Sequence, residues 1–396
     1  MKKGWQEKKL GDVAELSGRI GWKGLTAKEY TKEGPLFLSV HSLNYGDYVD
    51  FRDAFHISQE RYDESPEIML QKGDILICKD GAGIGKVGMI GELPDKTTIN
   101  SSLLLIRRYK EEVITKYLYF SLLSPGFQSI INSRLMGATT PHLYQRDIVD
   151  FPVFVPSLPE QQRIVSVLDE AFASIAQAKS NAERNLVNAQ ELFESYLKGV
   201  FETKRDDWEE KKLGDIGKVS MCKRVYKEQT TTTGDIPFYK IGTFGKEPDV
   251  FIPKSLYDEF RDKFSFPKMG DILISAAGTI GRRVKYDGEP AYFQDSNIVW
   301  IDNDEKQVLN DYLYQFYGAC NWNSTTGATI PRLYNDNLRQ IEIHFPKSLA
   351  EQRAIVGRLE ALSAETGRLE EIYEAKVEGL EELKKSVLGK AFGGEL

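Results

Sequence analysis

The residues that most resemble a reactive site lie in a glycine-rich stretch of the first half of the chain. It reads Asp80-Gly-Ala-Gly-Ile-Gly-Lys-Val87, and glycines ahead of a lysine can cradle phosphate groups with their backbone amides. A Walker loop, however, has glycine at the position of Asp80 and serine or threonine at the position of Val87. A similar stretch in the second half, Ala277-Gly-Thr-Ile-Gly-Arg-Arg283, lacks the lysine. We therefore expect a glycine-rich turn between strands rather than a nucleotide site.

Other patterns that would indicate catalysis are absent from the sequence. No two prolines are adjacent, which removes the Asn/Asp-Pro-Pro-aromatic motif of amino-methyltransferases. His41, His56, His142 and His344 show no metal-ligand spacing, and no Gly-x-Ser-x-Gly elbow occurs. We therefore expect no catalytic residue, no metal ion and no cofactor bound by this chain.

The composition predicts a multidomain protein of the cytoplasm. The 396 residues exceed one ordinary domain, and 41% hydrophobic residues suffice for packed cores. No run of about 18 apolar residues could span a membrane, and the lysines at the start precede no apolar stretch of a secretory signal. The three cysteines, Cys78, Cys222 and Cys320, are scattered, which is typical of a reducing compartment.

The net charge of −7 would disfavour nucleic acid as a partner if the charge were evenly spread. Much of the acid is concentrated in helical segments such as 351–382, however, and the distribution of charge decides binding. Composition alone therefore leaves the partner open.

The chain is internally duplicated. Four blocks recur in the same order: Trp5–Asp12 as Trp208–Asp215, Lys72–Cys78 as Met269–Ser275, Gly137–Tyr144 as Gly327–Tyr334, and Leu158–Val165 as Leu349–Val356. Between them lie stretches that do not match, such as 17–32 against 220–233. Chance does not give four blocks in one order. Two explanations stay open from the repeat alone: two modules of one fold that read different ligands, or duplication followed by drift.

A hydrophobic period near 3.5 follows each globular half and predicts two long helices zipped into a coiled coil. The first seam comprises Ile164, Leu168, Ala171, Ile175, Ala178, Ala182, Asn185, Ala189, Leu192 and Tyr196, and the second comprises Ile355, Leu359, Leu362, Thr366, Leu369, Tyr373, Lys376, Leu380, Leu383 and Val387. The first seam is rich in alanine where the second carries large side chains, which favours pairing within the chain. The pattern itself leaves parallel and antiparallel pairing open.

The globular halves are predicted to be mixed α/β. Strands are expected at 36–40, 75–78, 87–90, 103–107, 238–241, 272–275 and 298–301, and helices at 116–123 and 311–317. The predicted organisation is a first globular domain at 1–157, a helix at 158–203, a second globular domain at 204–348 and a second helix at 349–396.

These blocks resemble those of type I restriction-modification specificity subunits. The resemblance covers essentially the whole chain: a Trp-x-x-x-x-Leu-Gly-Asp start, a Lys-Gly-Asp-Ile-Leu block, a Gly-Ala-Thr-x-Pro-x-Leu loop and a Leu-Pro-Glu-Gln-Gln-Arg-Ile helix start, in two copies. Two departures occur in the second helix start, where Ala350 stands for Pro159 and Arg353 for Gln162.

The resemblance implies an α+β DNA-reading subunit without catalysis of its own. Each of two target-recognition domains would read one half of a split, asymmetric site in double-stranded DNA. Two helices packed antiparallel would set the gap and dock two methyltransferase subunits, and restriction subunits would join that complex. S-adenosylmethionine, ATP and Mg²⁺ would be bound by the partners. In this interpretation, the helix residues assigned to partner binding are Ile164, Leu168, Ile175, Leu359, Leu369 and Leu380.

DNA contacts are expected where the two halves diverge and where cations and aromatic residues gather in loops. In the first half these are Arg19, Trp22, Lys23, His41, Lys79, Lys86 and His142, and in the second half Lys223, Arg224, Lys240, Thr243, Arg282, Arg283 and Arg332. The alternatives are that Arg19 and Lys23 are solvated loop charges and that Trp22 belongs to a core. The Gly-Ala-Thr-x-Pro-x-Leu loop is expected to be a structural brace beside the helix, with His142 and Arg332 as phosphate contacts.

Two other functions remain possible from the sequence. One is a methyltransferase or nuclease with degenerate motifs, which S-adenosylmethionine binding by the isolated chain would reveal. The other is a coiled-coil assembly protein whose globular halves bind protein, which salt-sensitive DNA binding would contradict.

Overall fold

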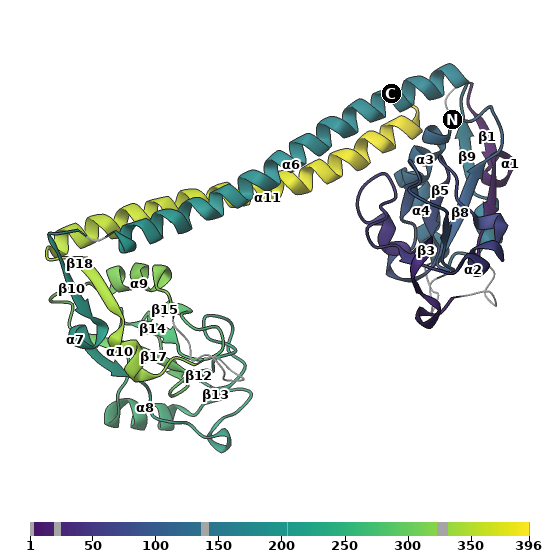
Figure 1. Ribbon diagram of the computed structural model, residues 1–396. Coiled ribbons are helices and arrows are strands. Elements are labelled where there is room, and N and C mark those ends of the chain that lie inside the picture. Colours follow the sequence, from purple (N-terminus) through teal and green to yellow (C-terminus); the bar gives the residue numbers. More distant parts are fainter. Residues whose placement is uncertain (1–3, 20–24, 136–141, 204, 323–331, 396) are drawn as a thin grey trace. The chain divides into compact units, whose positions relative to one another are not determined.

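The structure, a computed structural model, describes residues 4–19, 25–135, 142–203, 205–322 and 332–395. The chain divides into two compact units, Met1–Ala182 with Ala375–Leu396, and Glu183–Glu374. Each unit contains one globular domain and part of both long helices (Figure 1). No helix among the described residues is both long and apolar enough to cross a membrane.

The first domain contains three small sheets and five α-helices within the described residues. Its strands are β1 (Gln6–Lys9), β2 (Ala14–Ser17), β3 (Thr31–Leu38), β4 (Phe55–His56), β5 (Ile75–Cys78), β6 (Val87–Met89), β7 (Thr97–Ile99), β8 (Leu103–Arg108) and β9 (Pro152–Val155), and its helices are α1 (Leu10–Val13), α2 (Gln59–Asp63), α3 (Thr115–Leu123), α4 (Pro125–Leu135) and α5 (Gln145–Val149). The sheets have the orders β1-β9, β2-β8-β5-β6 and β4-β3-β7.

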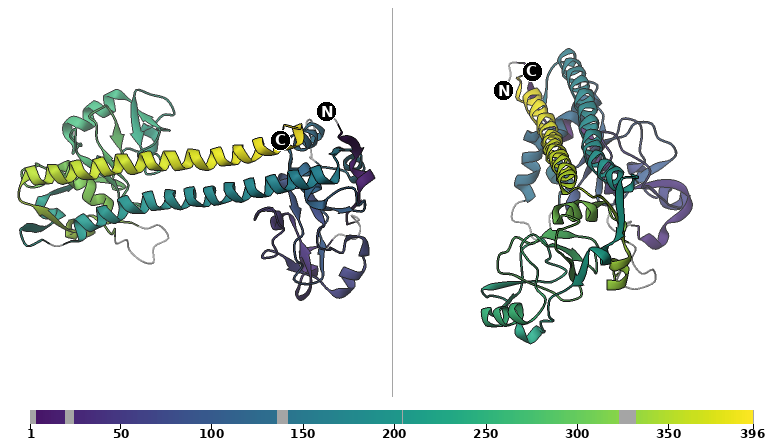
Figure 2. Two further views of the ribbon diagram at one scale, coloured as in Figure 1. Left: turned by 90° about the horizontal axis from the view of Figure 1, so that it is seen from above. Right: turned by 90° about the vertical axis from the view of Figure 1, so that its left-hand side faces the viewer.

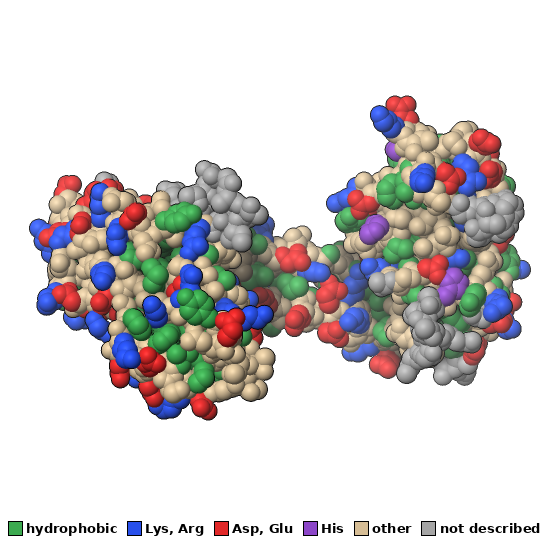
Figure 3. All heavy atoms as spheres, turned by 90° about the horizontal axis from the view of Figure 1, so that it is seen from below, with side chains coloured by type: hydrophobic (Ala, Val, Ile, Leu, Met, Phe, Trp, Pro, Cys, Tyr) green, Lys and Arg blue, Asp and Glu red, His purple; other side chains and the backbone are tan. Residues whose placement is uncertain are grey.

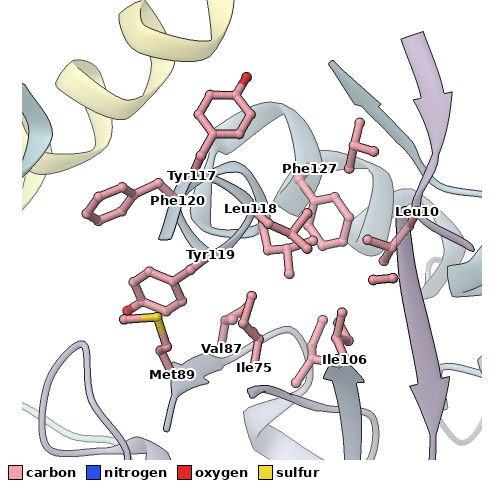
Figure 4. Packing of buried hydrophobic residues seen from close by; sticks show 14 of the residues in the cluster. Leu10, Ile75, Val87, Met89, Ile106, Tyr117, Leu118, Tyr119, Phe120 and Phe127 are labelled. Carbon is pink, nitrogen blue, oxygen red and sulfur yellow. The ribbon is translucent and has the colours of Figure 1, made fainter. Parts of the chain in front are cut away.

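The four-stranded sheet is buried on both faces. Successive side chains of a strand point to opposite faces, so Ile75 and Ile77 of β5 join the core beneath α3, whereas Leu76 and Cys78 pack toward the β4-β3-β7 sheet. Figure 4 shows Leu118 of α3 directed at the sheet. This arrangement explains why β5 reads as an uninterrupted apolar run rather than an alternating one.

The second domain repeats this architecture strand by strand, and its described helices match those of the first domain except for α4. Its strands are β10 (Trp208–Lys212), β11 (Gly217–Ser220), β12 (Ile236–Tyr239), β13 (Phe251–Ile252), β14 (Ile272–Ser275), β15 (Arg283–Lys285), β16 (Tyr292–Phe293), β17 (Ile298–Asn303) and β18 (Glu342–Pro346), and its helices are α7 (Leu213–Ile216), α8 (Lys254–Lys263), α9 (Asn310–Ala319) and α10 (Asn335–Gln340). The sheet orders, β10-β18, β11-β17-β14-β15 and β13-β12-β16, match those of the first domain. The predicted duplication and the α+β fold class are therefore confirmed.

The two long helices, α6 (Leu158–Glu202) and α11 (Leu349–Gly393), run antiparallel, as the resemblance implied. In the first unit Lys179 of α6 forms an ion pair with Glu381 of α11. In the second unit Gln190 of α6 donates to Glu370 of α11 at 3.2 Å. As the residue number increases along α6, the number of its partner on α11 decreases, which is the pattern of antiparallel helices. Figure 2 shows the helices side by side in each unit.

The predicted seam is wrong by one residue toward the end of each helix. Leu192 and Tyr196, expected inside, are 52% and 42% exposed, whereas Leu197 is 4% exposed. On α11 the predicted Leu383 is likewise exposed and Leu388 is buried. A helix with 3.6 residues per turn drifts by about 20° per heptad from a strict 3.5 repeat, which accumulates to about one residue over five heptads. The buried stripe therefore follows the straight-helix period.

Candidate nucleic-acid interface

The glycine-rich stretch connects two strands in each domain. In the first domain it leads from β5 through the 3-10 turn η5 (Gly81–Gly83) to β6, whereas a Walker loop joins a strand to a helix. Gly85 and the corresponding Gly281 adopt φ of 86° and 84°, in the left-handed region that favours glycine. The stretch is thus a hairpin turn whose glycines meet a backbone requirement.

Each hairpin turn is paired with the segment that closes the Gly-Ala-Thr-x-Pro-x-Leu block. The amide of Leu143 donates to the Lys79 carbonyl at 3.0 Å, and the amide of Leu333 donates to the Ala276 carbonyl at 2.8 Å. Isolated bridges join Asp80 to His142 and Ala277 to Arg332. The described part of the expected brace therefore supports the glycine turn; residues 137–141 and 327–331 lie outside the described residues.

His142, Lys79 and Lys86 of the first domain surround this turn. The His142 imidazole contacts the Asp80 carboxylate, and Lys86 is exposed and donates to the Asn44 side chain at 2.7 Å. Lys79 is half-buried, and its backbone amide donates to the Ser102 carbonyl at 2.9 Å. The structure thus brings three predicted DNA-binding residues to one loop pair.

The remaining candidates of the first domain are dispersed. Arg19 is only 3% exposed, donates to the Ile99 carbonyl at 3.1 Å and lies over the Phe37 ring. Burial, followed by the charge of Arg61, lowers the pKa of Arg19. His41 is exposed in the short helix η3 (Val40–Leu43), and Trp22 and Lys23 lie outside the described residues. Arg19 is thus neither the expected loop cation nor a solvated charge: it braces the domain interior.

In the second domain a groove of about 530 Å³ lies beside β12. Its lining includes Lys227, Thr230, Lys240 and Gln294, and it occupies the region where the two halves of the sequence diverge. Lys240 forms an ion pair with Asp249 at 3.2 Å, so its ammonium group is available to a phosphate only in exchange for that carboxylate. Polar and cationic side chains in a groove suit a nucleic-acid backbone and base edges.

Three further candidates lie in the same domain. Arg224 is exposed and pairs with Asp295 at 2.7 Å, and this hydrogen bond raises the pKa of Arg224. The Lys223 ammonium lies 4.9 Å from the centre of the Phe264 ring. The Thr243 hydroxyl accepts the Lys240 amide at 3.2 Å, so Thr243 shapes the turn after β12.

The arginines of the second glycine turn are engaged within the domain. Arg282 donates to the Phe244 carbonyl at 2.9 Å, and Arg332 donates to the Ser296 carbonyl at 3.3 Å. Arg283 stacks 4.5 Å from the Tyr314 ring and packs tightly against Gly318. These arginines are half-buried, so they hold the turn in place as well as carrying charge near it.

Sequence reasoning missed an exposed tyrosine that ends the same block in both halves. Tyr144 is 50% exposed and Tyr334 is 53% exposed, each directly after a buried leucine. A guanidinium lies near each ring, that of Arg146 at 4.8 Å from Tyr144 and that of Arg332 at 5.9 Å from Tyr334. Because the same tyrosine occurs in both halves, sequence reasoning assigned both copies to the scaffold. Their position next to an apolar leucine was a signal for exposure, since neighbouring side chains of an extended segment point in opposite directions.

The helix residues assigned to partner binding lie inside this chain. Ile164, Leu168, Ile175 and Leu359 are buried, and Leu369 and Leu380 are partly buried. Ile164, Leu168 and Ile175 belong to the core of the first domain. These six side chains therefore support the fold, and large exposed apolar side chains stand elsewhere on the helices, at Val187, Leu192, Tyr196, Ile372 and Leu383.

Charges of both signs are mixed on the face of the globular domains drawn in Figure 3. On the face of the second domain drawn in Figure 3, lysine and arginine side chains stand among acidic and hydrophobic ones, and histidine side chains reach the surface on the first domain. Among the described residues, no three His, Cys, Asp or Glu side chains gather in a way that could hold a metal ion. On the face drawn in Figure 3, a nucleic-acid interface would therefore depend on particular loop residues rather than on one large basic field.

Comparisons with known proteins agree with this architecture. A family model for the type I restriction modification DNA specificity domain matches residues 2–184 and again residues 205–378. A Haemophilus influenzae protein described as a type I restriction enzyme specificity subunit is 41% identical over 302 residues, which make up 75% of this chain and 76% of that protein.

Solved structures show the same fold. A chain from a type I R-M system studied for complex assembly and conformational transition superposes with a TM-score of 0.78 at 17% identity, covering 100% of this chain and 99% of that chain. The HsdS subunit from Thermoanaerobacter tengcongensis superposes with a TM-score of 0.63 at 17% identity, covering 100% and 98%. Because the family model matches both halves and a relative is 41% identical over the 302 aligned residues, the chain belongs to the type I restriction-modification DNA specificity family.

Proposed function

We propose that this chain is the non-catalytic DNA-reading subunit of a type I restriction-modification complex. Each globular domain reads one half of a bipartite, asymmetric site, and the antiparallel helices set the gap between the halves. The observation that carries this proposal is the duplication: two domains share every sheet order, yet differ in the loops beside β3 and β12. One fold with two different loop sets suits two different half-sites.

Base reading is assigned to the loops that differ between the domains. In the second domain these residues line the groove beside β12 or lie close to it in sequence, and comprise Lys223, Arg224, Lys227, Lys240 and Thr243. In the first domain they comprise His41, Lys79 and Lys86. Lysine and arginine supply phosphate contacts as well as base contacts, so the two roles separate only by experiment.

Phosphate contacts common to both half-sites are assigned to features that are exposed and repeated. Tyr144 and Tyr334 meet both conditions. A tyrosine hydroxyl can donate to a phosphate oxygen whatever the base sequence. His142 and Arg332, which precede them at the bridge to each glycine turn, would contact a phosphate at the same place through an imidazole N–H and a guanidinium group, respectively.

The partners in this proposal are two methyltransferase subunits, which dock on the helices, and restriction subunits that join them. S-adenosylmethionine, ATP and Mg²⁺ belong to those partners. Because the predicted contact residues of the helices are buried in this chain, docking is assigned to exposed apolar side chains such as Leu192 and Tyr196.

Methylation mapping with exchanged domains tests the proposal. The chain is produced with its methyltransferase subunits, and the methylated positions in the host genome are sequenced. We expect one bipartite motif, and replacing residues 205–348 with those of a relative should change one half of the motif and leave the other unchanged. Changes in both halves of the motif would contradict the assignment of one half-site to each domain. Methylation by the chain without partners would contradict a non-catalytic role.

A further inference from the structure

Each long helix begins with a glutamine whose side chain is fully buried. Gln161 in the first turn of α6 and Gln352 in the first turn of α11 are both 0% exposed. They occupy the same position of the repeated helix-start block. Glutamine is rarely so deeply buried unless its amide is hydrogen-bonded.

The Gln161 amide joins three segments of the first unit. Its oxygen accepts the Ile114 amide at 2.8 Å, and its nitrogen donates to the Glu112 carbonyl at 2.8 Å and to the Pro156 carbonyl at 2.9 Å. Glu112 and Ile114 lie in the loop before α3, and Pro156 follows β9. Both amide protons and the carbonyl oxygen are used, so the side chain ties the helix to the loop and to the strand end.

Gln352 makes the same three bonds in the second unit. Its oxygen accepts the Leu309 amide at 2.9 Å, and its nitrogen donates to the Gln307 carbonyl at 2.7 Å and the Pro346 carbonyl at 2.9 Å. All six partners are backbone groups. The side chains of the loops that bind each glutamine can therefore differ between the domains while this hydrogen-bonded joint between helix and domain keeps its geometry.

From these two joints we infer that Gln161 and Gln352 are positioning residues for the gap between the half-sites. They fix the direction in which each helix leaves its domain. Apolar contacts around Ile164 and Leu168 also hold the helix, but hydrophobic burial is non-directional, whereas three hydrogen bonds from one planar amide restrict rotation. This inference rests on the proposed function.

The length of the helices makes the joint angle decisive. Each helix has 45 residues, which at about 1.5 Å per residue spans roughly 67 Å. A rotation of about 3° at one end moves the other end by roughly 3.5 Å, close to the rise of one base pair. To distinguish gaps that differ by one base pair, the attachment of each helix to its domain must therefore be rigid to within a few degrees.

Methionine substitution tests the joint, because methionine approximates the length of glutamine without its hydrogen bonds. Gln161→Met is compared with Gln162→Met, whose side chain is exposed on the same helical turn, and Gln352→Met is compared with the exposed Arg353→Met. Each variant is assembled with the methyltransferase subunits in cells, and methylated sites in genomic DNA of the host, which offers every gap length, are mapped.

We expect Gln161→Met and Gln352→Met to keep both half-site sequences while methylation at gaps one base pair shorter or longer rises about tenfold relative to the native gap, the scale of losing one or two hydrogen bonds. The two control variants should keep the native gap. A variant that assembles and methylates only the native gap would overturn the inference, as would altered half-site bases at an unchanged gap.

Gln161→Glu provides a second variant if the methionine variant fails to assemble. It keeps an oxygen for the Ile114 amide but has no proton to donate to Glu112 or Pro156, and we again expect relaxed gap preference. Failure of both variants to assemble would assign Gln161 to folding alone and overturn the inference. Absence of any bipartite motif for the unsubstituted complex would instead defeat the proposed function, so the two failures are distinguishable.

Discussion

The ring of Phe392, near the end of α11, packs against the ring of Tyr117 in α3, with centroids 5.3 Å apart. The second unit repeats this contact: Phe201, near the end of α6, lies 5.2 Å from Tyr312 of α9. Each domain is therefore held by the start of one long helix and the end of the other. The helices are part of both domain cores, and neither globular half is complete without both.

Alanine substitution at these contacts should destabilise the fold. Phe201 is buried, so Phe201→Ala should lower the free energy of unfolding by about 3 kcal/mol, and the half-buried Phe392→Ala by about 2 kcal/mol. Urea denaturation measures both. Ile372→Ala, at an exposed helix position, serves as the control and should change stability by less than about 0.5 kcal/mol. Equal effects at all three positions would contradict this packing.

The helix seam gives a second stability prediction, because the strict heptad and the structure disagree about Leu192 and Leu197. The heptad places Leu192 inside, whereas the structure exposes it and buries Leu197. We expect Leu197→Ala to cost about 3 kcal/mol and Leu192→Ala to cost less than about 0.5 kcal/mol, measured by thermal or urea denaturation. A larger loss of stability from Leu192→Ala than from Leu197→Ala would instead support the strict heptad register.

The sequence predicted the elements whose burial follows from local pattern. β5 and β14 were predicted with the bounds that the structure has, because an apolar run of four residues between turns has few alternatives. The starts of α6 and α11 were marked by their repeated blocks. The alanine-rich seam of the first helix, set against large side chains of the second, also indicated pairing within the chain, which the antiparallel contacts confirm.

Sequence reasoning failed where a side chain's environment comes from distant residues. Arg19 was taken for a loop cation, but it is buried and donates to the Ile99 carbonyl, 80 residues away in the sequence. The seam register failed for another reason: a small error in period grows with helix length. Tyr144 and Tyr334 were missed because a repeated residue reads as scaffold whether it is buried or exposed.

A pH-dependent difference between the domains follows from Asp74 and Asp271, which occupy matching positions after the glycine of their blocks. Asp74 is buried and paired with Arg107 at 2.7 Å. In β17 the position of Arg107 is held by Asp302. Both buried carboxylates accept a backbone amide from the preceding turn, Asp74 from Gln71 at 2.7 Å and Asp271 from Lys268 at 2.8 Å, so the domains differ in the charge beside the carboxylate. Burial raises the pKa of Asp271, and the charge of Asp302 acts in the same direction.

A carboxyl whose pKa is higher in the folded state binds protons more readily when folded, so stability falls as pH rises above its ordinary pKa of 3.8 through the raised value. Asp271→Asn removes this charge and should raise the free energy of unfolding at pH 7 by up to about 1 kcal/mol, with the gain vanishing near pH 4. Asp74→Asn should instead lower it by about 2 kcal/mol, since Arg107 loses its partner. Denaturation at pH 4 and pH 7 measures both, and stabilisation by Asp74→Asn would contradict the assignment.

Docking of the methyltransferase subunits is testable on the exposed face of α6. Leu192 and Tyr196 lie one helical turn apart and are both exposed, so a partner could cover them. Leu192→Glu with Tyr196→Glu should reduce copurification of the methyltransferase at least about tenfold, because burying two new charges is unfavourable. The melting temperature of the isolated chain should change little. Copurification at the unsubstituted level would exclude this face from the interface.

The repeated tyrosines provide the sharpest test of DNA contacts that do not depend on sequence. Tyr144→Ala and Tyr334→Ala should each weaken binding of the assembled methyltransferase to cognate and unrelated duplexes by the same factor, about five- to tenfold, because a phosphate contact carries no base information. Fluorescence anisotropy over a series of salt concentrations measures both affinities.

Tyr226 is the matched control, since it is exposed like Tyr334 but lies outside the repeated blocks. Tyr226→Ala should either leave binding unchanged or affect one half-site alone, because non-matching loops are the ones assigned to base reading. Weaker binding to the cognate duplex alone after Tyr144→Ala would make Tyr144 a base reader. Loss of the methyltransferase subunits after Tyr144→Ala would instead place the repeated tyrosines at a protein interface. A residue that is repeated in both domains suits a protein partner that binds in two copies as well as it suits DNA phosphates.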